Sequence, residues 1–226
     1  IEPTQSLDEA LAAYEAAPEV EVLFESGNGG QPAAAAASTS MTFETWPPPD
    51  AVATPWYLAP GGSLAEDPAA EAPTATFQTD PDVSGDAYNI EGSDLITNTV
   101  SQWRPPNAIT STSWLSPPAE ADGALAGSTT LDLWVRLDQD DADLQAVLSE
   151  VSADGNETLI QVGWQRVSDA VEVPVAGTWL QVPIRLGTVG QLVRAGSQLR
   201  LQVGTPGDGQ VQWSFYPPDG PAAEVE

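Results

Sequence analysis

The chain has 226 residues, of which 41% are hydrophobic, and it contains eight tryptophans, so it is long and apolar enough to bury the core of a folded domain. Its charge is extreme, because 33 Asp and Glu stand against six Arg, with no His and a formal net charge of −27. A field of this sign repels phosphate backbones and anionic lipid surfaces, which argues against nucleic-acid binding and electrostatic membrane docking. Cationic partners or salt tolerance fit the composition better.

Residue types that the sequence lacks exclude several kinds of chemistry. Without Cys there are no disulfides, no Cys-ligated zinc and no thiol catalysis. Without His and without a G-x-S-x-G elbow, the chain cannot assemble an ordinary Ser-His-Asp triad or the common zinc sites. There is also no phosphate-binding loop, no dinucleotide fingerprint and no apolar run long enough to span a bilayer. We therefore expect no catalytic residue, cofactor or membrane span in this chain.

The first segment, "SLDEALAAYEAAP", predicts a short helix. Ser6 and Glu9 have the spacing of a capping box. Leu7, Leu11 and Tyr14 recur at i, i+4 and i+7, which aligns them in one apolar stripe. A helix this short is not stable alone and needs a surface for its stripe. We therefore predict that these three residues pack against a surface outside the helix.

After the helix the pattern changes to β structure. "VEVLFE" predicts a short strand, and "TFETWPPP" and "PWYLAPGGSL" place aromatic residues beside turn formers. Residues 66–100 are acidic and poor in large aliphatic residues. This segment predicts a long surface excursion with one strand near Ala75 to Gln78.

The second half is more regular. "TLDLWVRL" alternates apolar and polar residues, and "TWLQVPIRLG" repeats the alternation with a Pro183 that favours a sheet edge. "LQAVLSEVSADGNETLIQVGWQRV" predicts two strands joined by a hairpin turn at "DGN". "VRAGSQLRLQVG" predicts a glycine turn followed by a strand, and "VQWSFYPP" predicts one more. Many short strands separated by turn signals indicate an all-β fold, an antiparallel jelly-roll sandwich.

The stretch "RLDQDDADL" offers a candidate metal site. Asp138, Asp140, Asp141 and Asp143 could supply oxygen ligands for Ca²⁺. Their spacing does not match an EF-hand, and acidic residues are abundant everywhere in the chain. The alternative, which we favour, is a solvated connection between two strands.

Trp103, Trp134 and Trp164 are the candidates for sugar binding, because an exposed tryptophan on a β-sandwich can stack against a sugar ring. The alternative is packing in the core or in an interface, which accounts for most tryptophans in a domain of this size. No pair of carboxylates is singled out for glycoside hydrolysis. Arginines on strands are expected to pair with the abundant carboxylates rather than with a substrate. These arginines are Arg136, Arg166, Arg185 and Arg200.

Three stretches, in order, carry a family resemblance. They are "TFETWPPP" followed by "WYLAPGGSL", then "LAGSTTLDLWVRLDQDDADLQAVLSEVSADGNETLIQVGWQRVS" with its small-residue turn, Asp-rich bend and Gly-x-x-Arg, and "VPVAGTWLQVPIRLGTVGQLVRAGSQLRLQVG". Together they resemble the C-terminal jelly-roll domain, galactose-binding-domain-like in fold, of the cocaine esterase and X-Pro dipeptidyl-peptidase (CocE/NonD) group of serine hydrolases. The resemblance covers residues 42–216.

The resemblance implies a division of the chain. Residues 1–26 look like the last helix and strand of an upstream α/β-hydrolase domain, which would make Leu7, Leu11 and Tyr14 an interdomain interface. Residues 27–41 look like a flexible linker, and residues 42–226 like the C-terminal sandwich. The nucleophile, the acid and the His of such an enzyme would lie upstream, so no catalytic residue is carried over to this chain. The chain departs from the family in the turn at Ser197, where the family commonly has a His or another polar residue, and by the expected absence of a strand after "WSF". The second departure suggests processing at both ends.

The implied function is a non-catalytic domain that packs on an ester- or amide-cleaving hydrolase domain, helps to wall its active site and contributes to homo-oligomer contacts. The alternatives are a free-standing carbohydrate-binding or adhesion module and a purely structural domain of a cell-surface protein. The acidity and the absence of Cys fit an extracellular or cell-envelope location, or the cytoplasm of a salt-adapted organism.

Overall fold

The computed structural model describes residues 6–24, 37–79, 108–206 and 223–225. Its elements in chain order are α1 (Leu7–Glu15), β1 (Val20–Phe24), β2 (Thr39–Phe43), β3 (Tyr57–Ala59), β4 (Ser63–Ala65), β5 (Ala75–Phe77), β6 (Ser111–Leu115), β7 (Gly123–Leu137), β8 (Asp143–Val151), β9 (Glu157–Arg166), α3 (Val167–Ala170), β10 (Trp179–Val193), β11 (Gln198–Gly204) and β12 (Ala223–Val225). The predicted helix at the N-terminus, the strand after it and the strand near Ala75 are confirmed.

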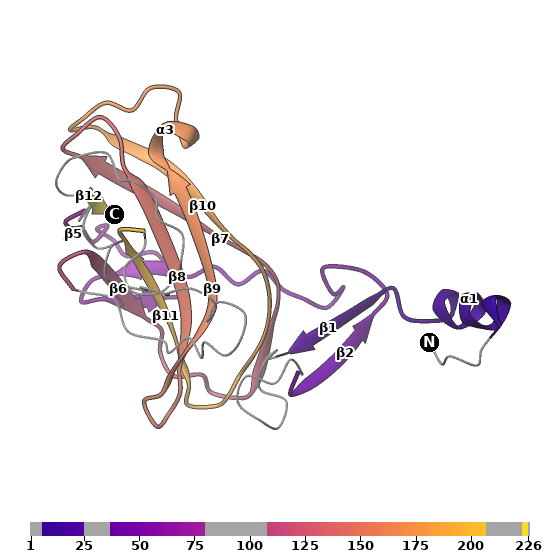
Figure 1. The fold of residues 1–226 in the computed structure, drawn as a ribbon. Coiled ribbons are helices and arrows are strands. Elements are labelled where there is room, and N and C mark those ends of the chain that lie inside the picture. The colour runs from indigo at the N-terminus through magenta and orange to yellow at the C-terminus, as the bar shows by residue number, and fades with distance from the viewer. Residues whose placement is uncertain (1–5, 25–36, 80–107, 207–222, 226) are drawn as a thin grey trace, which may run out of the picture.

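Two sheets face each other and form the body of the molecule (Figure 1). One has the strand order β10-β7-β12-β5 and the other β3-β4-β6-β11-β8-β9. Neighbouring strands are antiparallel except for the short parallel contact of β4 with β6. The all-β antiparallel sandwich predicted from the sequence is therefore confirmed.

The core lies between the sheets and is built from alternate residues of the long strands. On β7, Leu133 and Val135 are fully buried, whereas Asp132 and Trp134 point away from the core. Strands β8, β10 and β11 contribute in the same way, with Leu144, Ala146, Val182, Ile184, Leu201 and Val203. Each large aliphatic side chain removed from water in this way contributes about 1.5–3 kcal/mol before entropy is subtracted. The period-two pattern thus decides which face of β7 and of β10 is buried, whereas β8 is buried on both faces.

Turn and edge signals in the sequence are also confirmed. The chain reverses between β8 and β9 at the predicted hairpin turn, where Gly155 has a φ of 85° that favours glycine. Strand β10, which contains Pro183, lies at one end of its sheet. The turn before β11 places Gly196 at φ 84°, and the backbone N–H of Ser197 donates to the carbonyl of Arg194 at 3.0 Å.

Three boundaries differ from the sequence prediction. The small-residue stretch 125–129, predicted as a turn, is strand, because β7 pairs with β10 as far back as Gly123. Residues Thr39 to Met41, at the end of the predicted linker, are strand because β2 pairs with β1. A strand does follow the "WSF" segment, since β12 inserts between β7 and β5. The predicted strand at "VQWSFYPP" and most of the predicted linker and acidic excursion lie outside the described residues.

The two sheets approach each other closely where β9 meets β10. A Cβ added at Gly163 would lie 2.9 Å from the carbonyl carbon of Arg185 and 3.1 Å from the Cα of Leu186, and still closer to the Arg185 carbonyl oxygen. Beside this contact the Gln161 side-chain amide donates to the carbonyl of Thr188 at 3.0 Å. The glycine of the "GWQR" stretch is therefore required by the approach of two backbones.

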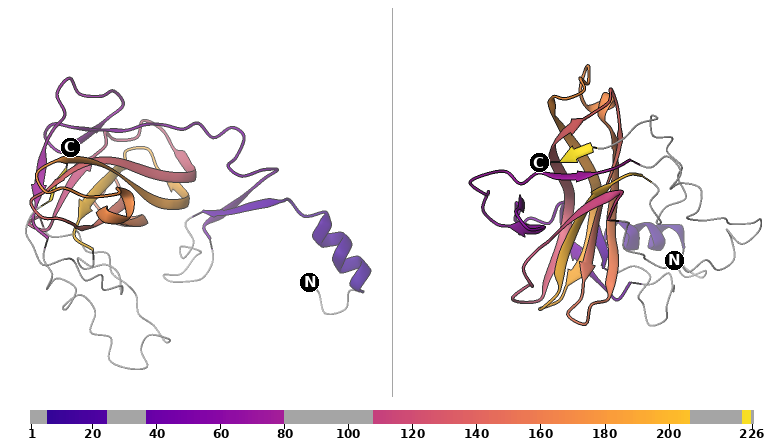
Figure 2. Two further views of the ribbon diagram at one scale, coloured as in Figure 1. Left: turned by 90° about the horizontal axis from the view of Figure 1, so that it is seen from above. Right: turned by 90° about the vertical axis from the view of Figure 1, so that its left-hand side faces the viewer.

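An arm made of α1 and the β1–β2 hairpin extends away from the sandwich (Figures 1 and 2). Its base is fixed by Phe24, which is fully buried, and by the Ser38 N–H, which donates to the carbonyl of Phe24 at 3.1 Å. Val22 packs against Gly190 of β10, because a Cβ added at that glycine would lie 2.8 Å from the Val22 Cγ1. The hairpin is thus joined to the sandwich, whereas α1 lies beyond it.

Candidate functional site

Helix α1 presents an apolar stripe that nothing in the described part of the chain covers. Leu7 is 82% exposed, Leu11 50% and Tyr14 79%, and no residue of the helix is buried. The structure therefore places the three predicted interface residues together on one side of the helix, which leaves their interdomain role a prediction.

Local hydrogen bonds begin this helix. The Ser6 Oγ accepts from the Glu9 N–H at 3.3 Å, and a Glu9 carboxylate oxygen accepts from the Ser6 N–H at 2.9 Å. This reciprocal pair is the predicted capping box. The hydrogen bond from the Ser6 backbone, followed by that from its side chain, lowers the pKa of Glu9. Helix α1 thus has a capped N-terminus and an apolar side that the described residues leave exposed.

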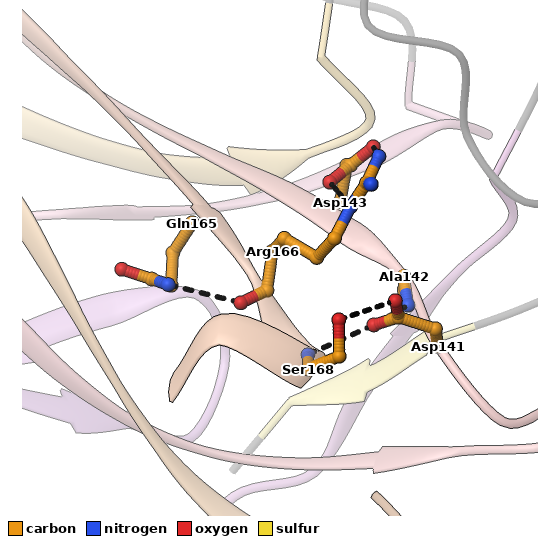
Figure 3. A network of polar contacts seen from close by, with 6 residues as sticks. All are labelled: Asp141, Ala142, Asp143, Gln165, Arg166 and Ser168. Atoms are coloured by element: carbon orange, nitrogen blue, oxygen red, sulfur yellow. Dashed lines mark hydrogen bonds and ion pairs between the residues drawn. The ribbon is translucent and has the colours of Figure 1, made fainter. Parts of the chain in front are cut away.

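The acidic candidates for calcium lie at the corner after β7, and two of them already have protein partners (Figure 3). Asp141 accepts hydrogen bonds from the backbone N–H and the hydroxyl of Ser168 at 2.9 and 2.7 Å and so holds the start of α3. The buried Asp143 carboxylate accepts two hydrogen bonds from the Arg166 guanidinium, at 2.8 and 2.7 Å. That interaction raises the pKa of Arg166.

The remaining two candidates, Asp138 and Asp140, are exposed. Within the described residues no group of three or more His, Cys, Asp or Glu side chains is arranged to hold a metal ion. The geometry therefore gives the calcium hypothesis no support, and the corner serves to fix the strand connection.

Other arginines are also bound to protein groups. Arg200, whose carboxylate partner the sequence left unnamed, donates to Glu157 at 3.0 Å, and Glu157 also accepts from the Ser149 hydroxyl at 2.6 Å. The guanidinium of Arg136 lies over the ring of Trp179, 5.0 Å from its centroid. These contacts favour the structural interpretation of both arginines over substrate recognition.

The three tryptophan candidates differ in position. Trp134 is 48% exposed on the outward side of β7. Trp164 is only partly exposed on β9, and Trp103 lies outside the described residues. Sequence reasoning missed Trp179, which the pairing of β10 with β7 places opposite Arg136 and diagonal to Trp134. Its outward position could be read from the alternation of "WLQVPIRL", but its neighbours could not.

Two sequence-based expectations concern a catalytic triad and a membrane span. The chain has no His, and hence no ordinary triad. In the part of the chain that the structure describes, no helix is long and apolar enough to cross a membrane.

Comparison with known protein families shows which family the chain belongs to. Residues 12–219 match the model of the X-Pro dipeptidyl-peptidase C-terminal non-catalytic domain. The chain belongs to this family. Among curated proteins, no relative matches.

Solved structures share the fold of this C-terminal domain. An aminopeptidase from a marine sediment Thaumarchaeota archaeon matches with a TM-score of 0.66 at 16% identity, over 92% of this chain and 38% of its own. A CocE/NonD family hydrolase from Staphylococcus aureus matches with a TM-score of 0.61 at 19% identity, over 83% and 36%. An α-amino acid ester hydrolase matches with a TM-score of 0.66 at 15% identity, over 83% and 37%.

The chain thus spans well under half the length of these hydrolases. It corresponds to the non-catalytic C-terminal domain of a hydrolase family whose catalytic domain is separate. This agrees with the absence of His and of any assembled triad, and it confirms the family predicted from the ordered sequence stretches.

Proposed function

We propose that this chain is the C-terminal β-sandwich of a serine hydrolase that cleaves esters or amides through an acyl-enzyme intermediate. In this proposal it packs on the α/β-hydrolase domain and helps to wall the active site. The observation that carries the proposal is the bare apolar stripe of α1, held on an arm outside the sandwich. A capped helix with no buried residue gains its stability from a surface outside the described chain.

The arm gives this contact a defined geometry. At its base Phe24 is fully buried and Val22 packs on Gly190, so the hairpin connects α1 to the long strand β10 of the sandwich. A catalytic domain that takes up residues 1–26 as its last helix and strand would therefore be joined directly to β10. The division of the chain after residue 26 and after residue 41 is part of this proposal. The second boundary falls within β2, which pairs with β1 along its whole length and is therefore grouped with the arm.

The first experiment is an activity assay. The isolated chain should not hydrolyse a p-nitrophenyl ester, because it lacks the base of a triad. The same chain joined to its upstream hydrolase domain should hydrolyse it. Turnover by the purified chain alone would refute the proposal.

The second experiment tests the stripe. In the two-domain protein, Leu11→Asp should weaken the association of the domains and lower ester hydrolysis, because it places a charge in an apolar contact. Ala12→Asp introduces the same residue one position along, away from the stripe, and serves as the matched control. Equal effects of the two substitutions would show that the stripe does not form the interface.

Location and assembly belong to the same proposal. The net charge of −27 and the absence of Cys support an extracellular or cell-envelope protein, or the cytoplasm of a salt-adapted organism. Contacts between copies of the enzyme through the sandwich are part of the family-based expectation. The galactose-binding-domain-like description of the fold belongs to the same family-based expectation.

A further inference from the structure

The outer face of the four-stranded sheet carries a group of side chains that the proposed function does not use. The pairing of β7 with β10 sets Trp134 opposite Gln181 and Arg136 opposite Trp179. These residues all point away from the core, because their neighbours Leu133, Val135, Leu180 and Val182 pack into it. We call Asp132, Trp134, Arg136, Trp179 and Gln181 the tryptophan strip.

Two aromatic rings of the strip have different surroundings. Trp179 is covered by the guanidinium of Arg136, 5.0 Å from the ring centroid, and this contact orients the arginine. Trp134 is 48% exposed although it lies within a long strand rather than in a turn. Its position is diagonal to Trp179 across the two strands, a spacing of about 7–8 Å. Trp134 therefore offers a flat apolar surface with an oriented cation beside it.

Polar groups flank this surface on the same side of the sheet. Asp132 precedes Trp134 by two residues and is exposed, and Gln181, also exposed, faces Trp134 across the strand pair. A carboxylate accepts hydrogen bonds, a guanidinium donates them and an amide does both. Together they supply partners of each kind around one aromatic ring.

This combination fits a sugar ring. A pyranose presents a face of C–H groups that stacks on an aromatic ring and a rim of hydroxyl groups that donate and accept hydrogen bonds. The net charge of −27 disfavours acidic sugars, nucleotides and nucleic acids. From Asp132 to Arg136 the strip extends about 14 Å at about 3.4 Å per residue, which is longer than one ring. We propose that the tryptophan strip binds a neutral oligosaccharide.

The strip lies at the other end of the strand ladder from the arm. The arm contacts Gly190, which pairs with Ala126 of β7. Trp134 lies roughly 27 Å further along the same strand at about 3.4 Å per residue. Binding at the strip therefore does not compete with the contact between the arm and β10.

The test uses the 226-residue chain and neutral hexasaccharides of glucose, xylose and N-acetylglucosamine in α and β linkage. Isothermal titration up to about 10 mM should detect at least one of them with a dissociation constant of about 0.1–1 mM. Trp134→Ala should raise that constant about tenfold or more, whereas Trp134→Phe, which keeps a ring, should change it by no more than about threefold. Gln181→Ala should have an intermediate effect. Leu159→Ala, which removes an exposed side chain from the other sheet, is the matched control and should have none.

Two outcomes would overturn the proposal. The first is that none of the hexasaccharides binds, or that Trp134→Ala binds as well as the unchanged chain. The second is that Trp134→Ala alters the molecular mass in sedimentation equilibrium while saccharide binding is absent, which would assign the strip to contacts between copies. Circular dichroism of each variant shows that the fold is retained. If the Trp134→Ala variant is unstable, Gln181→Ala tests the strip, and binding by that variant as tight as by the unchanged chain would overturn the proposal.

Discussion

The close approach of β9 to β10 at Gly163 allows a quantitative prediction of the effect of a substitution there. In a Gly163→Ala variant the new Cβ would meet the carbonyl carbon of Arg185 at 2.9 Å and the Cα of Leu186 at 3.1 Å. Favourable carbon contacts lie at about 3.5–4.0 Å, so β9 and β10 must separate by roughly 0.5–1 Å. Overpacking of this kind costs about 1–3 kcal/mol. We expect the upper end, about 3 kcal/mol, because the obstructing atoms are backbone and cannot change rotamer.

The assay is denaturation followed by tryptophan fluorescence. For a protein of this size about 1 kcal/mol corresponds to about 2–4 °C in Tm, so Gly163→Ala should lower Tm by about 6–12 °C. Gly123→Ala is the matched control, since it makes the same substitution at the start of β7, where an added Cβ would meet no atom within 4 Å. That variant should stay within about 1 kcal/mol of the unchanged protein. A Gly163→Ala variant as stable as Gly123→Ala would refute the close contact of β9 with β10.

Further predictions concern the ion pair and the helix cap. Arg166→Ala should lower the free energy of unfolding by about 1–3 kcal/mol, because it leaves the buried Asp143 carboxylate without two donors, whereas loss of the exposed Arg185 should change it by no more than about 0.5 kcal/mol. If both substitutions lowered the free energy of unfolding equally, the Arg166–Asp143 pair would contribute no more to stability than an exposed arginine. In an NMR titration, Glu9 should show a pKa below its usual range. The capping box is then fully present above the usual pKa of a glutamate and is lost as the pH falls through the lowered value. Ser6→Ala should move the pKa of Glu9 back up, and an unchanged pKa in that variant would contradict the cap.

Much of the site depends on register, which sequence patterns leave open. The expectation that Arg200 has a carboxylate partner is confirmed, but the partner is Glu157, 43 positions away, and any of 33 acidic residues satisfies the expectation equally. The calcium hypothesis at Asp141 and Asp143 receives no support for a similar reason. Neighbouring carboxylates can either bind a common ion or accept hydrogen bonds from separate protein donors. The positions of Arg166 and Ser168 in the folded chain decide between the two for Asp143 and Asp141.

The sequence by itself determined what short-range chemistry controls. The capping box of α1, the hairpin turn after β8, the alternation of β7 and β10 and the edge position of Pro183 all follow from residues that are neighbours in the chain, and the absence of His removes the triad. Only the tertiary structure decided which backbones meet and which side chains share a face. The approach of Gly163 to Arg185, the insertion of the three-residue β12 and the diagonal of Trp134 with Trp179 depend on strand register and sheet packing. Strand register and sheet packing are set by the summed burial of residues that are distant in the sequence, so no local sequence pattern predicts them.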